Sequence, residues 1–385
     1  MMLDTPWRKN VSGWVWLGML FTPAMIGVAN PCWSQEREFV SSSRLGLGTA
    51  MNLSASVRTG DLDGDGDSDV VVANGRHWPQ QNYVFFNQGG SRFTLQRPLG
   101  SDLATTYATE IADLDGDGDL DIAVGNDMAP NQVFLNDGRG NFDSGTVFGT
   151  ISSVRSLTLA DIDVDGDVDI LVTCRKRQNY ICFNDGKGRF VETQPFGTRT
   201  DSTIDVAVAD INGDKHPDLV LANRDRQANL TLVNDGTSRF VDPAEFGSGR
   251  DETRAVAVAD MNGDGFPDLI FANIGAPNGI CFLGPKGISS GSVEFGLPTG
   301  ATFALAVADI DNDGDLDVVS GNVGGPNAVH FNDGTGKTFK NRLFGDDNAT
   351  YGLAIDDFDG DGFPDIAVAN SEAGNRVFLN RPKRP

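Results

Sequence analysis

The sequence predicts an all-β fold, a seven-bladed β-propeller of four-stranded antiparallel blades. The main observation is an acidic signature, Asp-x-Asp/Asn-x-Asp-x-x-x-Asp, which occurs seven times at intervals of 48 to 52 residues. Short runs of alternating branched and small residues flank each copy, and helical periodicity is lacking. A fixed period of this size indicates one supersecondary unit that is repeated around a ring.

The fifth copy shows the expected blade most clearly. Residues 254–259 predict a first strand, and the acidic loop 260–268 follows it. Residues 269–273 and 279–283 predict the second and third strands, and a fourth runs towards Phe295. In other copies an Asn-Asp-Gly turn, a strong hairpin signal, separates strands three and four. These turns lie at 136–138, 184–186, 234–236 and 332–334.

The two ends of the repeat region predict how the ring closes. The last unit stops near Asn380 and lacks a fourth strand, whereas residues 39–46 precede the first loop without a unit of their own. The spacing from Phe39 to Gly46 equals that of the fourth-strand segment 190–197. We therefore expect the N-terminal strand to complete the seventh blade, which removes the exposed edge of an open array.

Alternating carboxylates in a tight loop are the oxygen donors that a hard cation such as calcium requires. Position seven of the loop varies, and where it is Phe only the backbone carbonyl can serve. The candidate ligands, five per loop, are Asp61, Asp63, Asp65, Asp67 and Asp69; Asp113, Asp115, Asp117, Asp119 and Asp121; Asp161, Asp163, Asp165, Asp167 and Asp169; Asp210, Asn212, Asp214, His216 and Asp218; Asp260, Asn262, Asp264, Phe266 and Asp268; Asp309, Asp311, Asp313, Asp315 and Asp317; and Asp357, Asp359, Asp361, Phe363 and Asp365.

The loops are expected to bind up to seven Ca²⁺ ions with unequal affinity. Gly at position six gives the backbone freedom for a tight turn, but the loop from Asp210 to Asp218 has Lys215 there and Asn212 at position three. We expect this site to be the weakest. An EF-hand is excluded because position twelve is apolar, as at Val72, and strands flank the loop. The alternative is a set of solvated acidic turns without metal.

The overall charge also favours cation binding by the loops. The net charge is −24, and the seven loops hold 30 of the 54 acidic residues. Much of the acidity is therefore assigned to cation binding, and a nucleic-acid partner is not expected.

The N-terminus predicts export. Arg8 and Lys9 precede an uncharged, largely apolar stretch, so residues 1–34 are interpreted as an export signal peptide and residues 37–380 as the propeller. The mature chain has no further apolar segment long enough to span a membrane, and we expect it to be secreted, periplasmic or on the cell surface. Cys174 and Cys182 either form a disulfide or remain separate buried thiols, and Cys281 is expected in the core.

These loops, with Phe-Gly pairs such as Phe148-Gly149 and Phe196-Gly197, resemble the FG-GAP/VCBS repeat family, whose blades also form integrin α-subunit propellers. The resemblance covers residues 37 to 380. It implies a calcium-loop propeller, but the family includes binding modules, lectin-like proteins and some polysaccharide-cleaving enzymes. It also implies that ligands meet the face opposite the calcium loops, where the second and third strands are joined.

On that face, paired Asn residues flank each loop between strands two and three and are interpreted as turn caps. The first of these loops is the longest and contains His77 and Trp78. Trp78 is expected either to contact a sugar or protein ligand or to pack against the next blade. Basic clusters at 175–177 and 224–226 either attract an anionic partner or keep the surface soluble.

A ring of residues is expected near the central opening, six positions before each acidic loop. It either binds an acidic ligand or fills the channel mouth. Its members are Ala55, Tyr107, Arg155, Ile204, Arg254, Phe303 and Tyr351.

The leading functional hypothesis is a non-enzymatic recognition module for glycans or proteins. The alternative is a polysaccharide lyase or hydrolase, for which Tyr107 and Arg155 are the best available pair. A structural part of a larger assembly is the third possibility.

Overall fold

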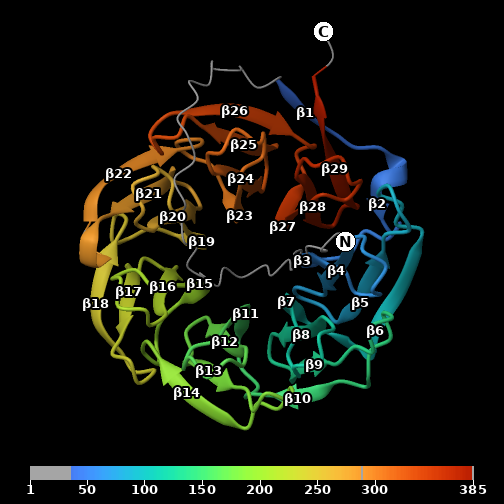
Figure 1. Cartoon of the computed structure of the whole chain (residues 1–385), viewed down its shortest axis with the longest axis horizontal. Helices are drawn as coiled ribbons and strands as arrows, with labels where there is room; N and C mark the ends of the chain where they lie inside the picture. Colours follow the sequence, from blue (N-terminus) through green and yellow to red (C-terminus); the bar gives the residue numbers. More distant parts are fainter. Residues whose placement is uncertain (1–35, 288, 384–385) are drawn as a thin grey trace, which may run out of the picture.

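The computed structural model describes residues 36–287 and 289–383, and it confirms the seven-bladed propeller (Figure 1). Each blade is an antiparallel sheet whose first strand lies next to the central axis and whose fourth strand lies at the rim. The first three blades consist of β3 (Ser54–Gly60), β4 (Asp69–Asn74), β5 (Gln80–Phe86) and β6 (Leu95–Ala104); β7 (Thr106–Ala112), β8 (Asp121–Asn126), β9 (Asn131–Phe134) and β10 (Thr146–Phe148); and β11 (Val154–Ala160), β12 (Asp169–Cys174), β13 (Asn179–Phe183) and β14 (Glu192–Phe196).

The remaining blades repeat this order. They consist of β15 (Thr203–Ala209), β16 (Asp218–Asn223), β17 (Asn229–Asn234) and β18 (Phe240–Phe246); β19 (Thr253–Ala259), β20 (Asp268–Asn273), β21 (Asn278–Leu283) and β22 (Ser289–Phe295); β23 (Thr302–Ala308), β24 (Asp317–Asn322), β25 (Asn327–Asn332) and β26 (Phe339–Phe344); and β27 (Ala349–Asp356), β28 (Asp365–Ser371) and β29 (Asn375–Pro382). Two 3₁₀ turns, η1 (Ser43–Leu45) and η2 (Pro285–Gly287), interrupt the strands.

The N-terminal strand completes the seventh blade, as the sequence predicts. Strand β1 (Arg37–Val40) pairs antiparallel with β29, with Arg37 opposite Pro382, and β2 (Gly46–Leu47) pairs with the start of β29. The buried Arg37 donates from Nε to Asn380 Oδ1 at 2.8 Å and from Nη2 to the Asn380 carbonyl at 3.0 Å. The ring is therefore closed by hydrogen bonds between its two ends.

The hydrophobic core lies between the blades. The described residues form seven buried clusters, and each one joins two adjacent blades. The cluster between the last and first blades includes Leu45 and Leu47 from the N-terminal segment, so the closing segment also contributes to the core. Residues 70–73 of β4 form an unbroken buried apolar run, because each blade buries both of its faces against its neighbours.

The paired Asn residues cap turns as predicted, and most also connect neighbouring blades. The Asn74 backbone N–H donates to Asn82 Oδ1 at 2.8 Å, and Asn82 Nδ2 donates to Thr106 Oγ1 of the next blade at 2.9 Å. Thr106 Oγ1 then donates to Asn126 Oδ1. Equivalent bonds to a hydroxyl of the following blade join Asn179 to Thr203, Asn229 to Thr253, Asn278 to Thr302 and Asn375 to Ser54.

Cys174, Cys182 and Cys281 are buried as free thiols, so Cys174 and Cys182 form no disulfide. Cys281 lies in the core as expected. No helix among the described residues is long and apolar enough to cross a bilayer. The predicted export signal, residues 1–34, lies outside the described residues.

Candidate functional site: acidic loops and the opposite face

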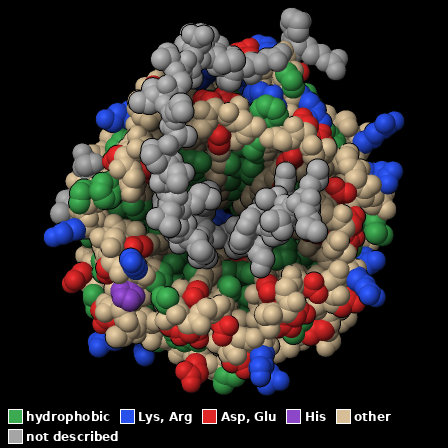
Figure 2. Space-filling model, in the orientation of Figure 1, with side chains coloured by type: hydrophobic (Ala, Val, Ile, Leu, Met, Phe, Trp, Pro, Cys, Tyr) green, Lys and Arg blue, Asp and Glu red, His purple; other side chains and the backbone are tan. Residues whose placement is uncertain are grey.

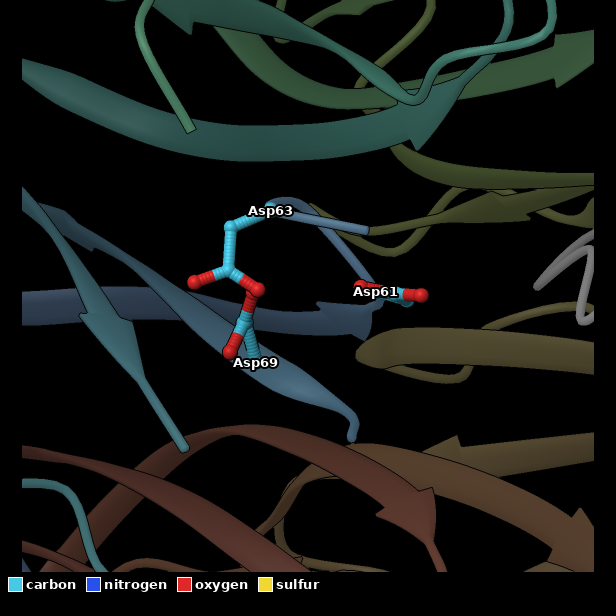
Figure 3. Close-up of side chains that lie close together, drawn as sticks. All are labelled: Asp61, Asp63 and Asp69. Carbon is cyan, nitrogen blue, oxygen red and sulfur yellow. The ribbon is translucent and has the colours of Figure 1, made fainter. Parts of the chain in front are cut away.

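The acidic loops join the first and second strands of each blade, on the face that also carries the hairpin turns between strands three and four; we call it the acidic face. In the first loop, Asp61 accepts the backbone N–H groups of Gly64 and Gly66 at 2.8 and 3.0 Å. Figure 3 shows Asp63 and Asp69 pointing toward one another, with Asp61 beside them. The loop therefore folds its carboxylates together.

The ninth residue of each loop is a buried carboxylate at the start of the second strand. Asp69 accepts the backbone N–H of Leu62 at 3.0 Å and that of Asn87 at 2.8 Å. Burial raises the pKa of Asp69 to about 8, and it raises the pKa of Asp317 to about 8 for the same reason. A cation nearby would oppose this shift because it stabilises the charged form of the carboxyl group.

Carboxylates gather tightly enough to hold a metal ion in five of the seven loops. In each group, one oxygen from every residue lies within 4.8 Å of the others. The first loop fits a hard cation further, because Asp63 Oδ1 is buried and accepts no hydrogen bond. The groups are Asp61, Asp63 and Asp69; Asp113, Asp115 and Asp121; Asp161, Asp163 and Asp169; Asp309, Asp311 and Asp317; and Asp357, Asp359 and Asp361.

The fourth and fifth loops have Asn212 and Asn262 at position three and thus fewer carboxylates. In the fourth loop Lys215 adopts a φ of 73°, the left-handed conformation that Gly adopts in the other six. A residue with a side chain is strained there. This strain agrees with the expectation that the fourth site is the weakest.

An arginine side chain occupies the seventh loop, which the sequence did not predict. The guanidinium of Arg381, on β29, forms ion pairs with Asp359 and with Asp361, the latter at 2.5 Å. Next to it, the Arg37 guanidinium lies over the Phe363 ring at 3.6 Å. The Phe363 side chain thus packs against the closing strand. Arg381 would compete with a metal ion for the same carboxylates.

The opposite face, which we call the upper face, is formed by the loops between strands two and three and by the links between blades. The ring predicted near the central opening begins there, and each of its members sits at a β-bulge. The pairing of first and second strands shifts register at every one of these positions. A bulge redirects the side chain and ends regular pairing.

Tyr107 and Arg155 are brought together as predicted. The Arg155 guanidinium lies over the Tyr107 ring at 4.4 Å and forms a 3.0 Å ion pair with Asp127. The Tyr107 hydroxyl is 3.2 Å from His77 Nδ1. Burial raises the pKa of Tyr107, and burial together with Arg76 and Arg155 lowers that of His77. Both side chains are therefore neutral near pH 7.

The other half of the ring is also stacked. Arg254 lies over Phe303 at 5.6 Å, and the rings of Phe303 and Tyr351 are 4.8 Å apart. Arg76, from the long loop of the first blade, lies over Tyr351 at 3.9 Å. Burial lowers the pKa of Arg254 to about 10. These contacts are made within the protein, which favours the interpretation that the ring fills the channel mouth.

Trp78 does not pack against the next blade; its surface is 72% exposed at the tip of the long loop.

The two basic clusters form ion pairs with different acidic residues. Arg175 is held by Asp225 at 2.6 Å, and Arg224 by Glu252 at 3.3 Å. Figure 2 shows one face of the disc, with a hollow at its centre and acidic side chains spread over the surrounding blades.

One ion pair near the axis, between the half-buried Arg58 and the buried Glu110, was missed. Arg58 Nη2 lies 2.5 Å from Glu110 Oε1, three positions before the first and second loops. Comparison of repeats could have found it, because the other five blades have Thr or Ala at this position. The members there are Thr158, Ala207, Ala257, Ala306 and Ala354.

Five overlapping segments match the FG-GAP-like repeat family: residues 61–124, 113–172, 161–221, 210–271 and 309–368. No curated protein matches the chain significantly. Among solved structures, a mercury-soaked crystal of BBS1N in complex with ARL6DN is similar with a TM-score of 0.60 and 12% sequence identity, over 89% of this chain and 97% of that chain. The lead-soaked crystal gives the same score and identity, over 90% and 97%. At this identity the similarity concerns the fold alone.

Proposed function

Because the chain belongs to the FG-GAP-like repeat family, we propose that it is a calcium-stabilised propeller that is exported and recognises a protein or glycan without altering it chemically. Calcium is the cation that suits the acidic loops, because they offer several carboxylate oxygens in a flexible turn. Its role is structural: it neutralises each turn and fixes the bend between the first and second strands. Export fits this role, since calcium sites of modest affinity fill outside the cell.

The observation that carries the recognition proposal is the exposed Trp78 on the upper face. A large aromatic side chain exposed at a loop tip gains free energy when a partner covers it, and Trp is enriched among residues that dominate binding. BBS1N, which has the same fold, forms a complex with ARL6DN, so a propeller of this kind serves as a protein-binding scaffold. The stacked ring beside Trp78 gives the loop a rigid base.

A second candidate function, polysaccharide lyase activity, is favoured by one contact. His77 and Tyr107 lie within hydrogen-bonding distance, and Arg155 is adjacent, as a base and a carboxylate-neutralising group would be. Two observations weigh against it. Tyr107 is buried with a raised pKa, so its phenolate is disfavoured, and Arg155 is already neutralised by Asp127. We therefore rank recognition first.

The two functions separate in one set of experiments on the full chain in calcium. A glycan array and a displayed library of short random peptides test binding, and release of unsaturated uronate from polyuronates tests lyase activity. Trp78→Ala should weaken binding of the selected probe about tenfold or more. Leu343→Ala, at a 62% exposed apolar residue on the rim strand β26, is the control. The proposal would be overturned if Trp78→Ala left binding unchanged, or if Tyr107→Phe abolished the release of unsaturated uronate.

A further inference from the structure

A pocket of about 490 Å³ lies on the upper face of the third blade. The link from the second blade forms one wall with Thr150 and Ser152, and the β12–β13 loop forms another with Lys176 and Arg177. Arg199, from the link to the fourth blade, lines it as well. Its volume lies within the range typical of ligand sites. The described residues around it include three cations and no carboxylate, in a chain of net charge −24.

Two of these cations are available to a ligand. Asp225 engages Arg175 through two hydrogen bonds, at 2.6 and 3.0 Å, and it lies 3.3 Å from Lys176. Among the residues that the structure describes, neither Arg177 nor Arg199 forms an ion pair, and both are exposed. Two guanidinium groups thus face the same pocket without a carboxylate to neutralise them.

The walls of the pocket are held in place. Lys176 has a left-handed backbone with φ of 57°, and its N–H donates to the Asp201 carbonyl at 2.8 Å. The Asp201 carboxylate accepts the Thr198 N–H at 2.6 Å, which fixes the turn that carries Arg199. At the floor, the buried Tyr180 hydroxyl donates to the Thr150 carbonyl at 2.8 Å. A preformed pocket loses little entropy when a ligand binds.

An arc of large apolar side chains leads from Trp78 to this pocket. Leu103, Met128 and Ile151 are each 60–62% exposed. Backbone contacts join the segments that carry these residues. Gln80, close to Trp78, pairs with Ala104, which follows Leu103. The Asp127 N–H then donates to the Thr105 carbonyl, and the Met128 N–H donates to the Ser152 carbonyl, next to Ile151. Ile151 stands between two pocket residues. The upper face thus carries four exposed apolar side chains on adjoining segments, a feature that favours an interaction site.

We propose that the apolar arc and the blade-three pocket together bind an acidic amphipathic segment of a partner protein. Its apolar side chains cover Trp78, Leu103, Met128 and Ile151, and a carboxylate enters the pocket between Arg177 and Arg199. The inference rests on the proposed recognition function and specifies its partner. A protein suits the surface better than a glycan, because three of the four arc residues are aliphatic or Met and offer no flat ring for a sugar. The pocket supplies the charge complementarity.

The test selects short random peptides from a displayed library on the calcium-loaded full chain and measures the affinity of synthetic copies. We expect selected peptides to combine apolar residues with Asp or Glu, and replacement of those acids by Asn or Gln to weaken binding about tenfold. The double variant Arg177→Gln/Arg199→Gln should remove that difference and leave affinity for the neutral peptides unchanged. Arg139→Gln/Arg189→Gln removes two exposed charges from the acidic face and should change nothing.

Two results would overturn the inference in distinguishable ways. If selected peptides lack acids, or the Arg177/Arg199 variant binds acidic and neutral peptides as the wild type does, the pocket assignment fails while the Trp78 surface stands. If Trp78→Ala and Met128→Ser leave peptide binding intact, or if oligogalacturonate binds through Arg177 and Arg199 while the peptides do not, a protein partner on this surface is wrong. If no glycan or peptide probe loses affinity when Trp78 is replaced by Ala, the recognition proposal itself is also wrong.

Discussion

Removal of calcium should destabilise the folded ring by an amount comparable to the whole stability of an ordinary domain. The described residues include five three-carboxylate groups. At a free calcium concentration about 100 times the dissociation constant, each site adds about 2.7 kcal/mol. Five equivalent sites would then add about 14 kcal/mol, against a typical total of about 5–15 kcal/mol. For these five groups the value is an upper estimate at that calcium concentration, because Arg381 already neutralises part of the seventh loop.

The assay is urea unfolding of the full chain, followed by circular dichroism in about 1 mM calcium and again in excess chelator, with magnesium as the ionic control. Asp63→Asn removes one charge where a buried oxygen has no partner, and should reduce the calcium-dependent gain by up to about 3 kcal/mol. Asp102→Asn, an exposed carboxylate near the end of β6, is the matched control. An unfolding midpoint that is the same in calcium and in chelator would refute the metal interpretation.

Four further outcomes are expected. Deleting residues 37–47 removes the burial of Leu45 and Leu47, each comparable to a Leu→Ala change of about 2–5 kcal/mol, and a truncated chain with normal urea unfolding would contradict the clasp. Arg58→Met should destabilise by about 3–5 kcal/mol by leaving Glu110 buried and unpaired, and adding Glu110→Leu should recover most of that loss; no recovery would count against the pairing. Burial lowers the pKa of His330 below 6.5, so the unfolded chain binds a proton that the folded protein does not, and stability is lost as pH falls below about 6.5. The His330→Gln variant should lose this component of the pH dependence. If the wild type and the variant show the same dependence of stability on pH, His330 is not its source. Burial raises the pKa of Cys174 to about 11 and of Cys182 to about 12, so peptide mapping should find both unlabelled by a thiol reagent in the folded protein and labelled in urea, whereas rapid labelling without urea would show that they are accessible.

The sequence was sufficient for those features that depend on local pattern. The acidic loops, the blades and the closure by residues 39–46 were predicted because each follows from spacing that repeats along the chain. Tyr107 and Arg155 were placed together for the same reason, since equivalent positions of adjacent blades become neighbours in a ring.

The features that were missed arise where distant segments meet. Arg381 is brought to the seventh loop because its neighbour Asn380 is held there, the Asn380 N–H donating to Asp365 Oδ1 at 2.7 Å, and nothing near Arg381 in the sequence indicates a carboxylate partner. Arg199 lines the same pocket as Arg177 because the link to the next blade turns back over the loop. Long-range pairs of this kind leave no periodic signal in a single sequence.

The contrast between the two faces bears on where a ligand binds. The acidic face repeats nearly the same loop in every blade, so its residues serve a need that each blade shares, namely holding one bend. A ring of equivalent loops cannot by itself distinguish one orientation of a ligand from another. Specific recognition therefore depends on departures from the repeat, and on the upper face the long loop with Trp78 and the basic pocket with Arg177 lie within blades one to three. A partner that occupied the remaining blades instead would meet surfaces without these anchors, which is why substitutions in blades one to three are the decisive ones.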